Sequence, residues 1–82
     1  MYYVYVLKST KDHKLYIGST INLRERFIQH QKGKVPSTKK RCPLYLIYYE
    51  ACRSEKDCYL REKSLKTGFG RAYLKRRLLN DS

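Results

Sequence analysis

The sequence lacks any apolar run that approaches the roughly 20 residues needed for a membrane-spanning helix. No basic leader or small-residue cleavage site precedes the first apolar residues, so we expect no secretory signal and a cytoplasmic location. Its three cysteines are too few and too irregularly spaced for a disulfide framework or a zinc ribbon, so free thiols are expected. At 82 residues the chain is too short for a multidomain enzyme, and we expect one domain over residues 1–82.

Most sequence templates for catalysis are also absent. There is no phosphate-cradling glycine-rich loop, no G-x-S-x-G elbow, no H-E-x-x-H motif and no adjacent carboxylate pair for two metal ions. Two histidines, His13 and His30, are too few for a multi-histidine metal site. Any reaction must therefore depend on a different set of side chains.

Acidic residues are scarce, because 7 Asp and Glu stand against 19 Lys and Arg and the formal net charge is +12. Self-repulsion at this density weakens a compact fold, so a polyanionic partner explains the charge better than solubility alone. We expect that partner to be nucleic acid. A merely soluble basic surface is the alternative.

Two segments concentrate the basic residues. Gly33–Cys42 contains no acid and is expected to be a mobile basic loop, and the stretch from Arg61 to Arg77 contains Glu62 as its one acid. These segments supply the predicted nucleic-acid contacts, which are Lys34, Lys39, Lys40, Arg41, Arg71, Lys75 and Arg76.

The N-terminal residues predict a β-hairpin. Tyr2–Ser9 is rich in β-branched and aromatic residues, residues 11–14 form a polar turn, and Leu15–Gly18 is a second short apolar run. The turn length pairs residues whose numbers sum to 23. Tyr5 then lies opposite Gly18 and diagonal to Tyr16, and the two tyrosines share a face of the sheet.

The remaining segments predict a helix, a strand and two further helices. A capping box at Asn22 starts the first helix, and Gly33 stops it. Residues 44–51 are almost continuously apolar, which favours a strand at the centre of a small sheet covered on both faces. A second helix starts at Ser54 and ends at Gly68, and a glycine-punctuated turn leads into a short terminal helix. The order is β-β-α-β-α-α, an α+β fold.

Four positions stand out as a chemical set: Tyr5, Tyr16, Arg26 and Glu62. Tyrosine hydroxyls can act as base or hydrogen-bond donor, a guanidinium matches phosphate geometry, and a carboxylate suits magnesium. Glu62 lies in line with the apolar side of its helix, where a simple ion pair with Arg61 or another neighbour is the alternative interpretation. Such a set of side chains is typical of a phosphodiesterase.

These residues, in this order, closely resemble the GIY-YIG nuclease superfamily. The resemblance runs through Tyr3-Val4-Tyr5, Tyr16-Ile17-Gly18, Arg26 with His30, and Arg61-Glu62-Lys63, and extends from Tyr2 to about Leu79. It is greatest to the small, standalone, single-domain members, of the UPF0213 type or like the N-terminal domain of UvrC. The sequence departs at Tyr3, where the glycine of the family name would stand.

The resemblance implies a three-stranded antiparallel sheet flanked by helices. It also implies a catalytic set of Tyr5, Tyr16, Arg26, His30 and Glu62, with Glu62 holding a single Mg²⁺ or Mn²⁺ ion. The implied reaction is hydrolysis of a phosphodiester bond, with DNA as the first substrate class. Tyr5 or Tyr16 would orient or deprotonate the water and Arg26 would stabilise charge on the phosphate, while His30 would be a further acid, a phosphate contact or a packing residue.

Two other functions fit the same residues less fully. A basic nucleic-acid-binding module with this fold and little or no catalysis is the principal alternative. A ribosome-associated or structural basic protein fits the charge but leaves the ordered set of four residues as coincidence. Nothing in the sequence supplies base readout, so a nuclease this small would be structure-selective, weakly selective or directed by a partner protein, with no role for a membrane.

Overall fold

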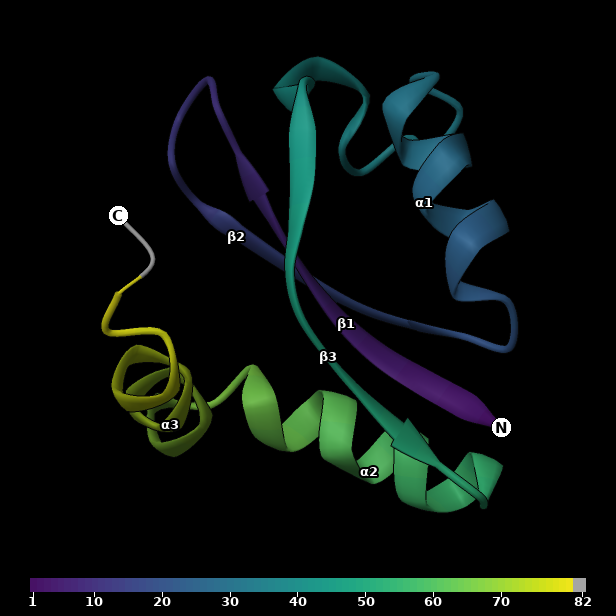
Figure 1. The fold of residues 1–82 in the computed structure, drawn as a ribbon, viewed down its shortest axis with the longest axis vertical. Helices are drawn as coiled ribbons and strands as arrows, with labels where there is room; N and C mark the ends of the chain where they lie inside the picture. The colour runs from purple at the N-terminus through teal and green to yellow at the C-terminus, as the bar shows by residue number, and fades with distance from the viewer. Residues whose placement is uncertain (81–82) are drawn as a thin grey trace.

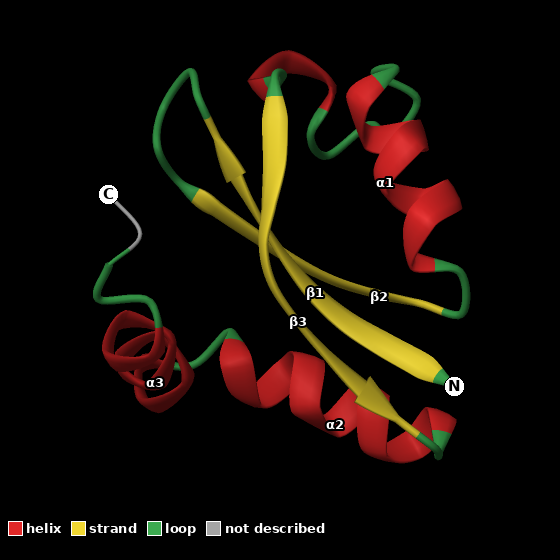
Figure 2. Cartoon of the chain, viewed as in Figure 1, coloured by secondary structure: helices red, strands yellow, loops and turns green. Residues whose placement is uncertain are grey.

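The computed structural model describes residues 1–80, so the last two residues of the expected 1–82 domain lie outside the described part. The elements follow the predicted β-β-α-β-α-α order (Figure 2). The strands are β1 (Tyr2–Ser9), β2 (Leu15–Thr20) and β3 (Leu44–Cys52), the α-helices are α1 (Leu23–Gln31), α2 (Glu55–Leu65) and α3 (Gly68–Arg77), and a 3₁₀-helix, η1, spans Lys39–Arg41. No helix within residues 1–80 has the length and apolar character to cross a membrane.

The three strands form one antiparallel sheet in the order β2-β1-β3. The predicted hairpin register is confirmed, because Tyr5 pairs with Gly18. The prediction that β3 lies at the centre is wrong, since β1 is the middle strand and β3 forms an edge. The apolar run of β3 contains tyrosines that remain in contact with water, and Tyr45 and Tyr49 are 37% and 53% exposed.

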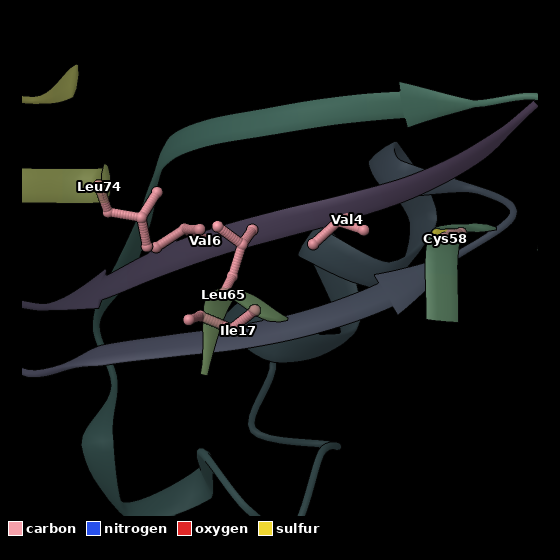
Figure 3. Packing of buried hydrophobic residues seen from close by; sticks show 6 residues of the cluster. All are labelled: Val4, Val6, Ile17, Cys58, Leu65 and Leu74. Atoms are coloured by element: carbon pink, nitrogen blue, oxygen red, sulfur yellow. The ribbon is translucent and has the colours of Figure 1, made fainter. Parts of the chain in front are cut away.

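The sheet lies between α1 on one side and α2 with α3 on the other (Figure 1). Alternation along β1 sends Val4 and Val6 to the side of α2 and α3, where they pack with Ile17, Leu65 and Leu74 (Figure 3). It sends Tyr5 and Leu7 to the side of α1, where Leu44, Tyr16, Leu23 and Phe27 complete a second cluster. The central strand β1 is thus buried on both faces and contributes side chains to both clusters.

Side-chain caps start all three α-helices. The predicted capping residues Asn22 and Ser54 accept hydrogen bonds from the backbone N–H of Glu25 and Asp57, and α1 ends just before Gly33 as predicted. The prediction that Gly68 ends the second helix is wrong: α2 ends at Leu65, and Thr67 caps a new helix that begins at Gly68.

The glycines of this segment lie inside α3 rather than in a turn before it. A Cβ on Gly70 would lie 2.2 Å from the carbonyl oxygen of Ser64, so the missing side chain lets α3 approach the end of α2. This close approach replaces the turn that the sequence predicts.

The basic segment between α1 and β3 is anchored to the rest of the protein. It contains η1 and buries the side chains of Val35 and Thr38. Ser9 Oγ donates to the carbonyl of Arg41 at 2.6 Å, which ties η1 to the β1–β2 turn. The expected mobile loop is therefore a segment held at both of its sides.

A bidentate ion pair fixes α2 against β3. The guanidinium of Arg61 donates to both carboxylate oxygens of Glu50 at 2.8 and 2.9 Å, and Tyr48 donates to the same carboxylate at 2.6 Å. Arg61 also lies 4.7 Å from the ring centroid of Tyr73 on α3. These contacts orient α2 so that the next residue, Glu62, is directed to the opposite edge of the sheet at β2.

Candidate active site

Tyr5 reaches from the central strand to a buried histidine. Its hydroxyl lies 2.8 Å from Nε2 of His30, and Nδ1 of His30 lies 2.7 Å from Oγ1 of Thr38. All three side chains are at most 1% exposed. A neutral imidazole has one donor and one acceptor nitrogen, so it satisfies both hydroxyls in either tautomer.

Burial and charge keep this histidine neutral. Burial, followed by the nearby charge of Arg26, lowers the pKa of His30 from 6.5 to about 4. Burial likewise raises the pKa of Tyr5, and hydrogen bonding to Arg26 acts in the opposite direction. The ring of His30 has no exposed surface, and its two nitrogens are engaged by Tyr5 and Thr38.

The close packing of Tyr5 explains why the residue after Tyr16-Ile17 is a glycine, Gly18. A Cβ at Gly18 would lie 2.6 Å from the hydroxyl oxygen of Tyr5 and 3.1 Å from Cε2 of Tyr16. The phenol of Tyr5 therefore crosses directly over the bare backbone of β2. Any side chain at this position would displace the tyrosine from His30.

Tyr16 and Arg26 lie on the same side of the sheet as Tyr5, and both are partly exposed. The ring centroid of Tyr16 is 6.3 Å from that of Tyr5 and 5.1 Å from that of His30. Arg26 extends from α1, and its Nη1 donates to Oε1 of Gln29 at 3.0 Å. Two bonds between the side chain of Gln31 and the backbone of Leu44 hold the end of α1 against β3.

Glu62 reaches the site from the other side of the sheet. Its Oε1 accepts a hydrogen bond from Ser19 Oγ of the edge strand β2 at 2.6 Å, and its Oε2 accepts from Nζ of Lys66 at 2.8 Å. Burial alone would raise the pKa of this carboxyl, but the bonds from Lys66 and Ser19 outweigh it and bring the pKa below its usual value. Glu62 is therefore ionised at neutral pH. Its side chain is 18% exposed.

Two hollows lie along β2, and each is lined by one of the two hydrogen-bond partners of Glu62. The first, which we call the Arg26 hollow, has a volume of about 360 Å³ and is lined by Ser19, Thr20, Asn22, Glu25, Arg26 and Gln29. The second, which we call the edge hollow, has a volume of about 670 Å³ and is lined by Tyr16, His13, Lys14, Arg41, Lys66 and Arg71. Ser19 belongs to one hollow and Lys66 to the other, so the two partners of Glu62 connect them.

The residues around Glu62 fit a single magnesium-like ion. Within residues 1–80 no group of three or more His, Cys, Asp or Glu side chains could hold a metal. An ion on Glu62 would take its other ligands from water and substrate phosphate, which is the usual manner of binding for Mg²⁺. The ionised, partly exposed carboxylate supplies the one hard protein ligand that this arrangement needs.

Tyr5, Tyr16 and His30 thus lie together on the α1 side of the sheet, whereas Glu62 contacts Ser19 of β2 from α2 on the other side. Of the predicted nucleic-acid contacts, Arg41 and Arg71 line the edge hollow. Lys75 lies one helical turn beyond Arg71 in an adjoining hollow, and Lys34, Lys39, Lys40 and Arg76 are exposed elsewhere.

Lys66, Ser19 and Thr38 contact the predicted site residues but are not among them. Lys66 lies four residues after Glu62, a spacing that could have identified the ion pair. No comparable spacing identifies Ser19 or Thr38. Ser19 is 43 positions from Glu62, and Thr38 lies outside the helix that carries its partner His30.

Comparisons with known proteins relate the sequence to a family of small domains. A family model described as the GIY-YIG catalytic domain matches residues 1–77. The chain is 40% identical to a UPF0213 protein of Staphylococcus haemolyticus over 67 residues, which cover 80% of each chain. It is 41% identical to a UPF0213 protein of Pediococcus pentosaceus (79% of this chain and 68% of that one) and 39% identical to one of Clostridium perfringens (80% and 71%). No solved structure matches the chain significantly.

Proposed function

The chain belongs to the GIY-YIG catalytic domain family, whose domain implies a nuclease-type function, and from this premise we propose that it is a divalent-metal-dependent endonuclease. Its substrate would be a phosphodiester bond of nucleic acid, with DNA as the first to test. The observation that carries the proposal is the position of Glu62 beside β2, where one carboxylate oxygen is bonded to Ser19, which lines the Arg26 hollow, and the other to Lys66, which lines the edge hollow.

The role that we propose for each site residue depends on how exposed its side chain is. Arg26 is half-buried beside Tyr5, so a phosphate that enters its hollow gains charge stabilisation from a guanidinium in a partly desolvated place. A divalent ion bound at Glu62 would polarise that phosphate and stabilise the leaving oxygen. Arg26 and Glu62 would then approach the phosphate from two sides of β2.

We assign the attacking water to Tyr16 rather than to Tyr5. Tyr16 is partly exposed and borders the edge hollow, whereas Tyr5 is 1% exposed and already bonded to His30. Tyr16 would orient the water and, in its phenolate form, accept its proton. Tyr5 and His30 are positioning residues that hold the Tyr16 ring and Arg26.

The main competing function is a nucleic-acid-binding module without catalysis. The observation that favours it is the saturation of Glu62, since Ser19 and Lys66 already occupy both carboxylate oxygens. A metal ion must displace at least the ammonium of Lys66. Exposed pairs of this type contribute at most about 1 kcal/mol, so the displacement costs little.

The deciding experiment is incubation of the protein with end-labelled single-stranded, duplex and branched DNA, with Mg²⁺, with Mn²⁺ and with chelator. Metal-dependent cleavage that leaves defined 5′ and 3′ ends would support the endonuclease. Binding without cleavage on every substrate, RNA included, would favour the module.

A further inference from the structure

The edge hollow is strongly cationic. None of its lining residues is an acid, and five carry basic side chains: His13, Lys14, Arg41, Lys66 and Arg71. Building on the proposed function, we propose that this hollow is a second phosphate subsite, which holds a phosphate that neighbours the cleaved one on the same strand.

One wall of the hollow is preorganised, because hydrogen bonds fix the turn that carries Lys14. Oγ of Ser9 accepts the backbone N–H of Lys11 and Asp12 at 3.0 and 3.3 Å, and Asp12 Oδ1 accepts the N–H of Lys14 at 2.9 Å. His13 between them has a φ of +60°, a left-handed conformation that histidine adopts more readily than most residues.

Arg41 joins this turn to the outer edge of β2. Its Nε lies 3.2 Å from Oδ2 of Asp12, and its Nη2 donates to the carbonyl of Leu15 at 3.4 Å. The guanidinium that lines the hollow is thereby held in place by two contacts. A cation that is already positioned loses less side-chain freedom when it binds phosphate.

Two interactions connect the hollow to the chemistry. Tyr16 lines it directly, and Lys66 lines it while bonding to Oε2 of Glu62. A phosphate in the hollow would therefore lie within reach of the ammonium that covers Glu62. The Arg26 hollow begins at Ser19, the other hydrogen-bond partner of Glu62, which gives the strand a path along β2 from one hollow to the other.

The binding test compares two double variants in a Glu62→Gln background, so that no cleavage interferes. Lys14→Gln with Arg71→Gln removes two cations from the hollow. Arg53→Gln with Lys56→Gln removes the same charge from exposed residues around the start of α2, away from the hollow. Affinity for a labelled oligonucleotide is measured by fluorescence anisotropy from 50 to 200 mM salt.

The subsite predicts a specific change in salt dependence. Removal of one cation that neutralises a phosphate reduces the slope of log K against log salt by about 0.7 for single strands and about 0.9 for duplex DNA. The Lys14/Arg71 variant should show this smaller slope, so its affinity should decrease less between 50 and 200 mM salt, by a factor of about three for each cation removed. Equal slopes for the two double variants would overturn the subsite.

A second arm separates strand phosphate from free phosphate and ties the subsite to cleavage. Inorganic phosphate at constant ionic strength should not displace the oligonucleotide from the wild-type hollow, and full displacement at low concentration would overturn the strand assignment. The cleavage assay uses proteins that keep Glu62. One neutral methylphosphonate next to the cleaved phosphate should slow cleavage of the DNA strand by the wild type. The same substitution should have no further effect on cleavage by Lys14→Gln/Arg71→Gln. Additive effects at every position would contradict the proposal, whereas failure of the wild type to cleave would reject the nuclease function and leave the binding test decisive for the subsite.

Discussion

The hydroxyl of Tyr5 and Nε2 of His30 lie 2.8 Å apart in a part of the protein closed to solvent. Tyr5 belongs to the central strand and His30 to α1, so this one bond joins the sheet to the helix that carries Arg26. A change in the charge of His30 therefore affects the placement of Arg26 as well as the stability of the fold.

We predict that stability decreases as His30 is forced to accept a proton. Burial and Arg26 lower the pKa of His30 to about 4, against 6.5 without these effects. Because the folded state binds the proton more weakly, this contribution is complete above pH 6.5 and is lost as the pH falls from 6.5 toward 4. The difference, 6.5 minus about 4, corresponds to about 3 kcal/mol.

Urea unfolding of wild type and His30→Gln at about pH 7, 5.5 and 4.5 measures this contribution. The free energies of the two proteins should converge at low pH, and the ring-proton NMR signals of His30 should report its titration directly. Parallel pH profiles for the two proteins would contradict the prediction.

Glu62→Gln should abolish metal-dependent nicking while DNA binding stays equal or becomes slightly tighter. The amide keeps the shape and the contact with Ser19 but is a much poorer ligand for a hard dication. Glu55→Gln removes the same charge from an exposed position of α2 and is the matched control. Thermal melting, Mn²⁺ titration and nicking on the same preparations decide the role of Glu62, and unchanged nicking by a folded variant would remove it from the site.

Gly18→Ala should displace Tyr5 and destabilise the protein by about 1–3 kcal/mol, the usual cost of overpacking. The added methyl carbon would lie 2.6 Å from the Tyr5 hydroxyl and 2.8 Å from Cζ, which burial prevents from moving aside. Gly68→Ala is the control, because its Cβ would meet nothing within 4 Å. Urea unfolding and the Tyr5–His30 cross-peaks in NMR spectra test this, and equal stabilities for the two variants would count against the close approach.

Glu50 and Arg61 should show strong energetic coupling. Removing either partner leaves the other charge without its bidentate bond at a site where the side chains of Arg61 and Glu50 are only 31% and 22% exposed. We expect each of Glu50→Gln and Arg61→Met to cost about 1–3 kcal/mol, with the double variant far from additive. A double-mutant cycle from urea unfolding measures the coupling, and Lys56→Gln controls for loss of an exposed charge on α2. A coupling near zero would mean that Arg61 does not fix α2.

Affinity for DNA should fall steeply with salt, and replacing Lys34, Lys39 and Lys40 together with Gln should reduce the slope. Each neutralised duplex phosphate contributes about −0.9 to the slope of log K against log salt. Lys39 and Lys40 belong to η1, Lys34 precedes it, and all three are exposed, so the variant should keep its melting temperature. An affinity that barely changes between low and moderate salt would contradict a phosphate-led interface.

The hairpin could be predicted from the sequence because turn length and alternation together determine its register. Tyr5 and Tyr16 meet for this local reason, and the helix caps at Asn22 and Ser54 are equally local. The position of β3 could not be predicted in the same way. A run such as Leu44–Cys52 is compatible with a central strand or with an edge strand whose tyrosines cover it, and only the pairing of β1 with both neighbours decides.

Long-range partners limit the prediction of the site. The sequence indicates that Glu62 faces inward, but Ser19, Thr38 and the edge hollow depend on how α2 and η1 pack against β2. The end of α2 differs from the prediction because a glycine after a helix ordinarily marks a C-cap, whereas Gly68 starts α3 and Gly70 provides close helix contact. Such contacts have no local signature.

The sheet ends at β2 on one side and at β3 on the other, and the two ends are not equivalent. An exposed strand edge can accept a further strand from another chain or from a fused domain. A strand added along β3 would extend the sheet and leave Tyr16 and Glu62 accessible, whereas one added along β2 would cover both hollows. If the proposed function holds, a peptide that pairs with β2 should compete with nucleic acid for both hollows, whereas one that pairs with β3 should not.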